Sequence, residues 1–268
     1  LDFQARMTAA GGNLLSDNEL NAINYWISQY KYYKLWDKMI AYYPLVGGNG
    51  GAGSLASFTI NLKSSLYTLL NAGGVTNAMC NKTGFKNTGS TANGSTSVWN
   101  TGINDSILDQ NNKGMSCYII TGELKTNTYD MGVLLNGYSY INILAAAVTA
   151  INYEQDYYSG ILSEGIDIPR INPSPIGYYA GNTINSLATT YKNGAVLRSV
   201  TKTYTTTGIA FPIYLSCARR SDVTSIEVSS RTYGSWAIHQ AYTPAEEKQR
   251  AIIEQNFQNL LGRAVSIS

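Results

Sequence analysis

The chain has 268 residues and a formal net charge of +2, and only 13% of its residues are charged, about half the usual share. Hydrophobic residues make up 44% of the chain, which argues against disorder, and without a basic run nucleic acid is not expected as a partner. No apolar run approaches the ~20 residues that a membrane-spanning helix needs, so we expect no membrane insertion.

Residues 1–46 are predicted to form an N-terminal helical segment. Ser16 and Glu19 have the spacing of a capping box, in which the two side chains bind backbone amides at the start of a helix. Apolar residues follow at helical spacing: Leu20, Ile23, Ile27 and Tyr30. A second helical piece is predicted to carry Leu35, Trp36, Met39, Ile40 and Tyr43 before Pro44 ends it. The glycine-rich residues 47–53 are typical of a flexible connector.

From residue 55 to about residue 242 the pattern changes to short strands. They are predicted at 57–63, 96–103, 115–121, 131–135, 139–148, 176–181, 209–218 and 235–242. Asn193-Gly194 predicts a hairpin within 188–204, because a type I′ turn needs positive φ at both central residues. Many short strands at this spacing, with glycine, asparagine, serine and proline between them, predict a mainly β fold, an antiparallel β-sandwich or jelly roll.

A helix is predicted to close the chain. Thr243 and Glu246 form a second capping box, and Pro244 suits the first helical position. Gly262 supplies the stop. The predicted apolar face consists of Ile252, Ile253, Phe257, Leu260 and Leu261. We expect this helix to cap the sandwich, so that residues 55–268 form one domain; a partner-binding helix is the alternative.

Few residues in the chain can carry chemistry. The three cysteines follow no metal-binding pattern, and their odd number argues for a reducing compartment over a disulfide framework: Cys80, Cys117 and Cys217. His239 is the single histidine, and its place in an apolar strand favours a structural role. No nucleotide-binding loop, nucleophile elbow or EF-hand loop is present. We therefore expect neither a cofactor nor a metal.

Residues 151–160 hold the strongest candidate for a binding site. Glu154 and Asp156 are the one clean pair of acids at i, i+2, in a segment predicted to be a loop, where solvated acids are the simpler interpretation. The chain has 21 tyrosines, whose stacking face and polar tip suit sugar rings or protein interfaces. Tyr157 and Tyr158 adjoin Asp156, so these three residues are our candidate glycan-binding site; ordinary loop packing is the alternative.

Three segments, in order, carry a resemblance to a known family: "GYYAGNTINSLATTYKNGAVLRS", "FPIYLSCARR" and "YTPAEEKQRAIIEQNFQNLLGR". They resemble the closing part of laminin G-like, or concanavalin A-like, jelly-roll domains in tailed-phage virion proteins. Residues 1–48 and 87–103 resemble the helical lead-in and early strands of those proteins, whereas 104–175 match nothing. The acid-x-acid-x-x-acid strand of glucanases with the same fold is missing.

The resemblance implies a non-enzymatic structural protein of a phage virion: a head fibre, capsid decoration or tail appendage. It would be assembled in the cytoplasm of the bacterial host and displayed on the virion surface, with other virion proteins and host-surface polysaccharide as expected partners. Two alternatives remain open. A polysaccharide-degrading tail depolymerase is disfavoured by the missing acid cluster, and a secreted lectin by the odd cysteine count and the lack of a signal peptide.

Proteins of this phage type are commonly trimeric, so the resemblance also implies a homotrimer. The N-terminal helical segment carries more apolar surface than one cap needs, and Trp26 and Tyr33 lie partly off its apolar stripe. We therefore expect Trp26 and Tyr33 to contact a neighbouring subunit. The alternative is that both sides of these helices pack on the sandwich.

Overall fold

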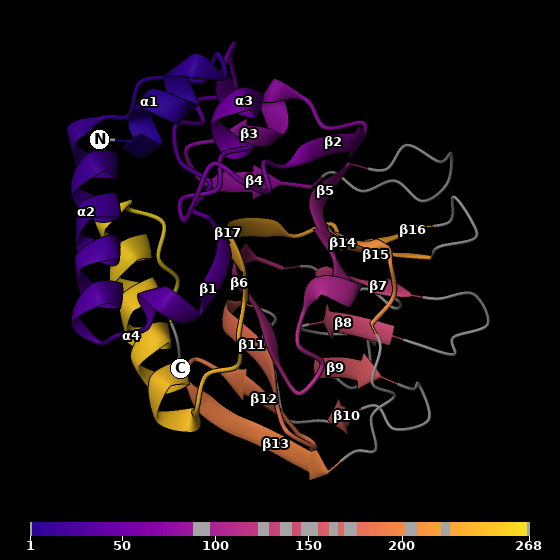
Figure 1. Cartoon of the computed structure of the whole chain (residues 1–268). Helices are drawn as coiled ribbons and strands as arrows, with labels where there is room; N and C mark the ends of the chain where they lie inside the picture. Colours follow the sequence, from indigo (N-terminus) through magenta and orange to yellow (C-terminus); the bar gives the residue numbers. More distant parts are fainter. Residues whose placement is uncertain are drawn as a thin grey trace.

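In the computed structural model the described residues are 2–87, 97–122, 129–134, 141–145, 155–160, 166–168, 176–201, 208–220 and 226–266. They form two β-sheets that face one another and a layer of helices on one side (Figure 1). The predicted mainly β antiparallel sandwich with a C-terminal helix is confirmed.

The first sheet contains eight strands within the described residues. Its order is β13 (Ala195–Thr201), β12 (Leu187–Lys192), β11 (Gly177–Ile184), β6 (Asn112–Thr121), β17 (Thr232–His239), β4 (Gly84–Lys86) and β3 (Cys80–Asn81), and β1 (Met39–Tyr43) also pairs with β17. All these pairs are antiparallel. The strand β17 is buried along its whole length and pairs with three strands that come much earlier in the chain, β1, β4 and β6.

The second sheet has nine strands in the same described ranges. Its order is β10 (Ile166–Ile168), β9 (Gln155–Gly160), β8 (Ile141–Ala145), β7 (Met131–Leu134), β14 (Pro212–Leu215), β5 (Val98–Asn104) and β2 (Leu70–Gly73). Two short strands lie beside this path: β15 (Cys217–Arg220) pairs with β7, and β16 (Ile226–Val228) pairs with β15. The β15–β7 contact is parallel and the other named strand pairs are antiparallel.

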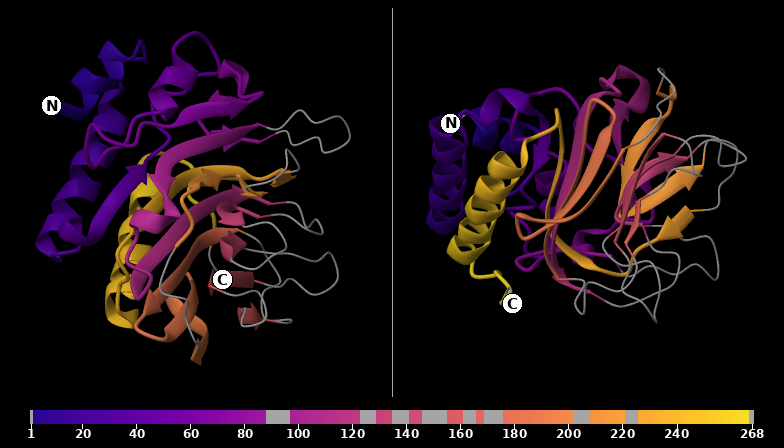
Figure 2. Two further views of the ribbon diagram at one scale, coloured as in Figure 1. Left: turned by 45° about the vertical axis from the view of Figure 1, so that its right-hand side comes forward. Right: turned by 90° about the horizontal axis from the view of Figure 1, so that it is seen from below.

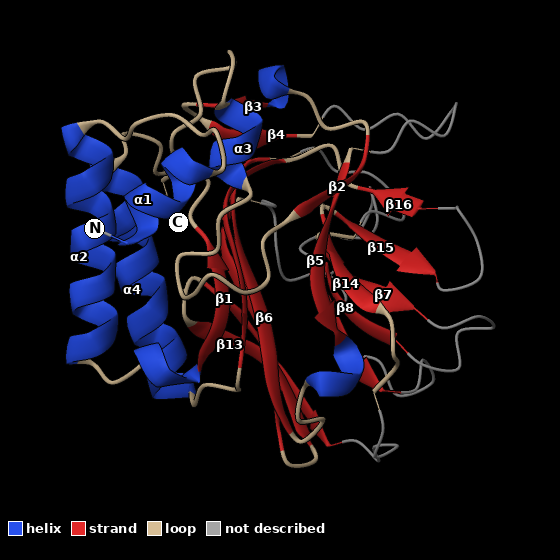
Figure 3. Cartoon of the chain, turned by 45° about the horizontal axis from the view of Figure 1, so that its top comes forward, coloured by secondary structure: helices blue, strands red, loops and turns tan. Residues whose placement is uncertain are grey.

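Helices form the third layer. α2 (Asp17–Tyr32) and α4 (Pro244–Leu260) lie side by side on the outer face of the first sheet, away from the second sheet (Figures 2 and 3). The shorter elements are α1 (Asp2–Ala9), α3 (Ser54–Phe58), η1 (Trp36–Lys38), η2 (Asn77–Met79) and η3 (Asp105–Ile107). Both predicted capping boxes are formed, at Ser16 with Glu19 and at Thr243 with Glu246.

Each pair of adjacent layers encloses apolar side chains. Trp99, Trp236 and Phe85 belong to the core between the two sheets. A second core under the helices includes Trp26 and Phe257. The three cysteines are buried, and burial raises the pKa of the Cys80 thiol to about 12. The reducing compartment stays a prediction.

Three predicted elements are wrong. Residues 39–43 form strand β1 instead of helix, because their backbone pairs with β17, from Met39 opposite His239 to Tyr43 opposite Trp236. The strand predicted at 57–63 begins as helix α3 and continues without regular structure. Residues 155–160 form strand β9 instead of a loop, since their backbone pairs with β8 and β10. The predicted hairpin is confirmed, with Asn193 at φ 50° and Gly194 at φ 81°.

Trp26 is not available for a subunit contact, and that assignment is wrong. Its side chain is fully buried, with ring centroids 3.7 Å from Tyr30 and 4.0 Å from Tyr42. Its indole Nε1 donates to Glu254 at 3.2 Å. Trp26, which the sequence places partly off the apolar stripe of α2, therefore faces α4 and β1. Tyr33, next to the exposed Tyr32, keeps 43% of its surface exposed, and its role as a subunit contact stays a prediction.

We expect Trp26→Ala to lower the free energy of unfolding by about 3–5 kcal/mol, because it leaves a large cavity between α2, α4 and β1. Urea unfolding followed by circular dichroism measures this. Tyr32→Ala is the matched control on the same helix: Tyr32 is 76% exposed, so we expect a change within about 0.5 kcal/mol. Equal small losses in both variants would contradict the burial of Trp26.

Candidate functional site

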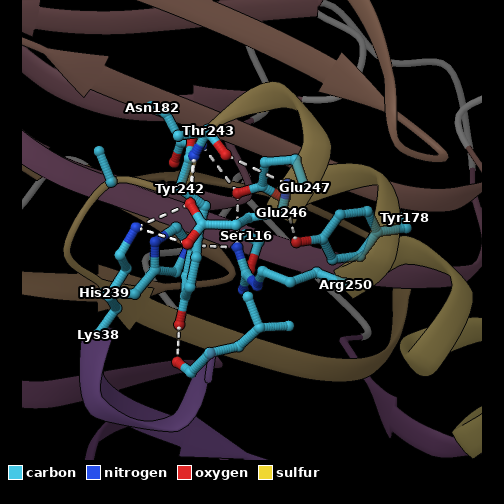
Figure 4. Close-up of polar contacts among 12 residues, drawn as sticks. Lys38, Ser116, Tyr178, Asn182, His239, Tyr242, Thr243, Glu246, Glu247 and Arg250 are labelled. Carbon is cyan, nitrogen blue, oxygen red and sulfur yellow. Dashed lines mark hydrogen bonds and ion pairs between the residues drawn. The ribbon is translucent and has the colours of Figure 1, made fainter. Parts of the chain in front are cut away.

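Arg250 of α4 is the centre of a buried polar network on the outer face of the first sheet (Figure 4). Its guanidinium donates to the hydroxyl of Tyr30 on α2 at 3.1 Å and to the hydroxyl of Ser116 on β6 at 2.8 Å. It also forms an ion pair with Glu247 at 2.6 Å. Arg250 thus connects the two long helices to the sheet, and burial of its charge is compensated by a carboxylate.

Glu247 extends the network toward β11. Its carboxylate accepts hydrogen bonds from the hydroxyl of Tyr178 at 2.9 Å and from the amide of Asn182 at 2.8 Å. Asn182 and His239 leave no room for a side chain at Gly114 on β6. A Cβ on Gly114 would lie 2.1 Å from the Asn182 Oδ1 and 2.4 Å from the His239 Cε1. Glycine at position 114 is therefore required for this packing.

The surroundings of His239 define its tautomer. Nδ1 lies 2.9 Å from the carbonyl oxygen of Gln240, which only accepts, and Nε2 lies 3.0 Å from Nη1 of Arg250, which only donates. The ring must therefore be neutral with its proton on Nδ1. Burial, and next the charge of Arg250, hold the pKa of His239 well below its usual value. The predicted structural role of this histidine agrees with these contacts.

The network cannot be reached by a ligand. Arg250, Glu247, His239 and Glu254 are each 1% exposed or less. Its side chains bind one another and hold α4 on the sheet. The predicted apolar face of α4 is accordingly wrong in part: Ile252 and Leu260 are exposed, whereas the buried residues include Glu247, Arg250, Glu254 and Gln258.

An open pocket of ≈ 510 Å³ lies where the first turn of α2 meets the end of α4. Four segments line it: 13–19 before and in α2, 45–49 after β1, 81–82 at β3, and 261–263 after α4. In Figure 1 this is the end of the helical layer where α1, α3 and β3 lie. Residues far apart in sequence therefore form one concave surface.

The floor of the pocket is held by local hydrogen bonds. The carboxylate of Glu19 accepts from the backbone amides of Ser16 at 2.9 Å and Gly47 at 2.7 Å. The Asn13 side chain donates to the Gly47 carbonyl at 2.7 Å. Below them, Arg263 donates to the carbonyls of 44, 45 and 234. These bonds fix the shape of the pocket without a ligand.

Three polar side chains at the pocket remain available. The structure describes no hydrogen bond to the side chain of Asn18 or of Lys82, and both are exposed. Asn81 uses its carbonyl oxygen to accept from the Thr83 amide at 2.9 Å, and its Nδ2 has no acceptor among the described residues. Amide and ammonium groups of this kind are suited to hydrogen-bond sugar hydroxyls or carboxylates.

The sequence-predicted site lies elsewhere. Asp156, Tyr157 and Tyr158 are in β9, where Asp156 pairs with Asp167 and Ala145 of the adjacent strands. Their side chains and Glu154 lie outside the described residues. None of these residues lines the pocket, and their role in glycan binding stays a prediction.

Sequence reasoning missed the pocket. Ser16 and Glu19 were recognised as a helix cap, but nothing linked them to Asn81, Lys82 or Arg263. The only signal is that Asn13 and Asn49 follow glycines, and asparagine is too common in this chain for that to mark a site.

The described residues contain neither a cluster of metal ligands nor a membrane-spanning helix. No group of three or more histidine, cysteine or acidic side chains is placed to hold a metal ion. Among the same residues, none of the helices has the length and apolar character needed to cross a membrane.

No protein-family model matches the chain, and no curated protein matches it. Solved structures do match its fold. Domain 4 of AbnA, a GH43 extracellular arabinanase from Geobacillus stearothermophilus solved in complex with arabinotriose, has a TM-score of 0.53 and 16% identity, over 80% of this chain and 98% of that one.

Two further structures are similar over 84% of this chain. Trypanosoma rangeli sialidase in complex with sialic acid has a TM-score of 0.53 and 12% identity, and the match covers 34% of that chain. The binding domain of Paraclostridial Mosquitocidal Protein 1 has a TM-score of 0.50 and 13% identity, over 53% of that chain. At these identities the likeness shows the β-sandwich fold alone.

The contacts of His239 predict that the protein loses stability as the pH falls below about 6.5. His239 is the only histidine, and it stays neutral when folded but binds a proton near pH 6.5 when unfolded. The unfolded state therefore gains protons as the pH falls below 6.5, and stability is lost. Between pH 6.5 and 5.5 we expect a loss of about 1 kcal/mol in the free energy of unfolding.

Urea unfolding at the two pH values measures this loss, and His239→Gln is the control. Carboxylates ordinarily titrate near pH 4, so the glutamine variant should show a much flatter profile in this window, whatever its absolute stability. An unchanged slope in the variant would contradict the assignment of His239 as the titrating group.

Proposed function

We propose that this chain is a non-catalytic glycan-binding β-sandwich whose binding site is the pocket between the first turn of α2 and the end of α4. The observation that carries the proposal is the pocket itself, with the free side chains of Asn18 and Lys82 and the free Nδ2 of Asn81 around a floor held by hydrogen bonds. Preorganised sites with a few convergent polar groups are typical of small-ligand binding.

The structural comparisons support a sugar as the ligand class. Domain 4 of AbnA, similar over 98% of its length, was solved with arabinotriose bound, and the sialidase with sialic acid. The polar, weakly charged composition of this chain fits the same ligand class. Glycan binding is accordingly the function that the fold and the pocket favour together.

The arrangement of acids supports a binding role over hydrolysis. Glycoside hydrolysis normally needs two carboxyl groups that face one cleft. Glu19 is the one carboxylate among the described lining residues, and backbone amides already occupy it. We therefore propose that the bound glycan is released unchanged.

We expect binding of oligosaccharides on a glycan array, with arabinotriose among the probes, and no release of reducing ends. Asn18→Ala removes a free amide at the pocket without breaking a described hydrogen bond, and should weaken binding about three- to tenfold. The matched control is Asn259→Ala, an exposed asparagine on α4 outside the pocket. Binding that both variants leave unchanged would place the site elsewhere, and saturable release of reducing ends would contradict the non-catalytic role.

We further propose that the glycan-binding sandwich is carried on the surface of a tailed-phage virion, as a homotrimer attached to other virion proteins. The sequence resemblance supports this, and the exposed pair Tyr32 and Tyr33 at the end of α2 offers a contact surface. Light scattering should give a trimer mass that Tyr33→Ser reduces. A monomer at all concentrations would contradict the trimer.

A further inference from the structure

The pocket carries more positive than negative charge. Arg263 and Lys82 line it as cations, and Glu19 is the one opposing carboxylate among the described lining residues. Both Glu19 oxygens already accept hydrogen bonds, one from Gly47 and the other from Ser16, so this carboxylate is committed to the protein. Neither cation forms an ion pair with a described carboxylate.

Arg263 is only 7% exposed, yet no carboxylate lies within ion-pair distance of it among the described residues. Its N–H groups bind neutral acceptors: the carbonyls of Pro44, Leu45 and Gly234 at 2.7, 2.9 and 2.8 Å, and Oε1 of Gln258 at 2.6 Å. These bonds use four of the five N–H groups that a guanidinium has, and the remaining hydrogen on Nη1 has no described acceptor.

Such a cation gains from an added anion. Burial is the largest influence on the pKa of Arg263 and lowers it to about 10, although the more distant Glu254 and Glu19 act in the opposite direction. A buried charge is stabilised when a hydrogen-bonded opposite charge lies beside it, and the one free N–H of Arg263 can donate to one oxygen of a carboxylate. Lys82 adds a second, exposed positive charge at the same pocket.

The pocket is poorly suited to recognise an uncharged sugar by stacking. Neutral sugar rings commonly pack on aromatic faces, and none of the described lining residues is aromatic. Its apolar lining consists of leucines at 14, 15, 45 and 261, which fit small alkyl groups. Charge and hydrogen bonding must therefore supply the specificity.

We propose that the pocket binds the carboxylate of an acidic sugar residue, through Lys82 and the free N–H of Arg263, while Asn18 and Asn81 bind its hydroxyl groups. This inference rests on the proposed function and names its ligand class. It follows from the geometry of one cavity. Two cations, Lys82 and Arg263, line it together with one described carboxylate, Glu19, which already accepts hydrogen bonds from the protein itself.

The test compares ligands that differ only in the carboxylate. Isothermal titration of the whole chain compares trigalacturonate with its methyl ester and 3′-sialyllactose with its methyl ester, so that each pair keeps the sugar and removes the charge. We expect each acid to bind about tenfold or more tightly than its neutral counterpart. The difference should shrink at high salt, since exposed charge pairs are screened.

Lys82→Met removes one charge and keeps the aliphatic stem, and Lys248→Met is the matched control on the exposed side of α4, outside the pocket. The preference for acids should fall in the first variant and persist in the second. Arg263 is left unchanged because its bonds hold three segments of the fold together.

The outcomes separate this inference from the proposed function. Equal binding of acid and ester, weakened by Asn18→Ala, overturns the acidic ligand and leaves glycan binding in place. An acid preference that Lys82→Met does not change also overturns the inference, since the carboxylate then lies elsewhere. Failure of acids, esters and the whole glycan array to bind overturns both.

Discussion

Arg250 has to be paired because a fully buried guanidinium without partners would cost several kcal/mol. Its partners come from α2, β6, β17 and its own helix, so the charge is compensated only when all these elements are assembled. Apolar packing alone would permit α4 to slide or rotate on the sheet, whereas this set of directional bonds defines one orientation. The rest of the helical layer depends on that orientation.

Glu254, one turn after Arg250 on α4, is a second buried charged residue that binds several elements. Glu254 accepts from Trp26 of α2, Tyr42 of β1 and Ser235 of β17. Beyond the helix end, Arg263 binds the chain after β1. Arg250, Glu254 and Arg263 therefore form a row of buried polar anchors between the helices and the first sheet. The last of them reaches the floor of the pocket, so the docking of α4 also shapes the candidate site.

The helical layer changes what the sandwich can offer to a ligand. α2 and α4 lie on the outer face of the first sheet and bury side chains of β1 and β17 there (Figure 2). The concave surface that the structure describes lies instead at the seam between the helices and the loops after β1 and β3. A binding site at this seam would be specific to a sandwich with such helices. The similarity to other sandwiches, at 12–16% identity, shows the fold alone, and the position of a site depends on the residues of this chain.

Little of the candidate site could be predicted from the sequence. Asn18, Asn81 and Lys82 lie in segments with no sequence signal that joins them, and they meet because α2 and β3 are brought together by tertiary packing. Asp156, Tyr157 and Tyr158 were the predicted glycan-binding site because they are adjacent in sequence, but adjacency along a chain does not create a cavity. The cations of the pocket, Lys82 and Arg263, are separated by 181 positions, and no local pattern marks them.

The sequence by itself determined the features that depend on near neighbours. Both capping boxes join residues three apart, and the hairpin needs only two adjacent residues that tolerate positive φ. Tertiary structure alone decided the rest. Residues 39–43 are a strand because β17, about 200 residues later, pairs with their backbone, and Trp26 is buried because β1 and α4 pack against it. The charged face of α4 is buried because its partners lie on other elements, and a charge can leave water only where such partners are already in place.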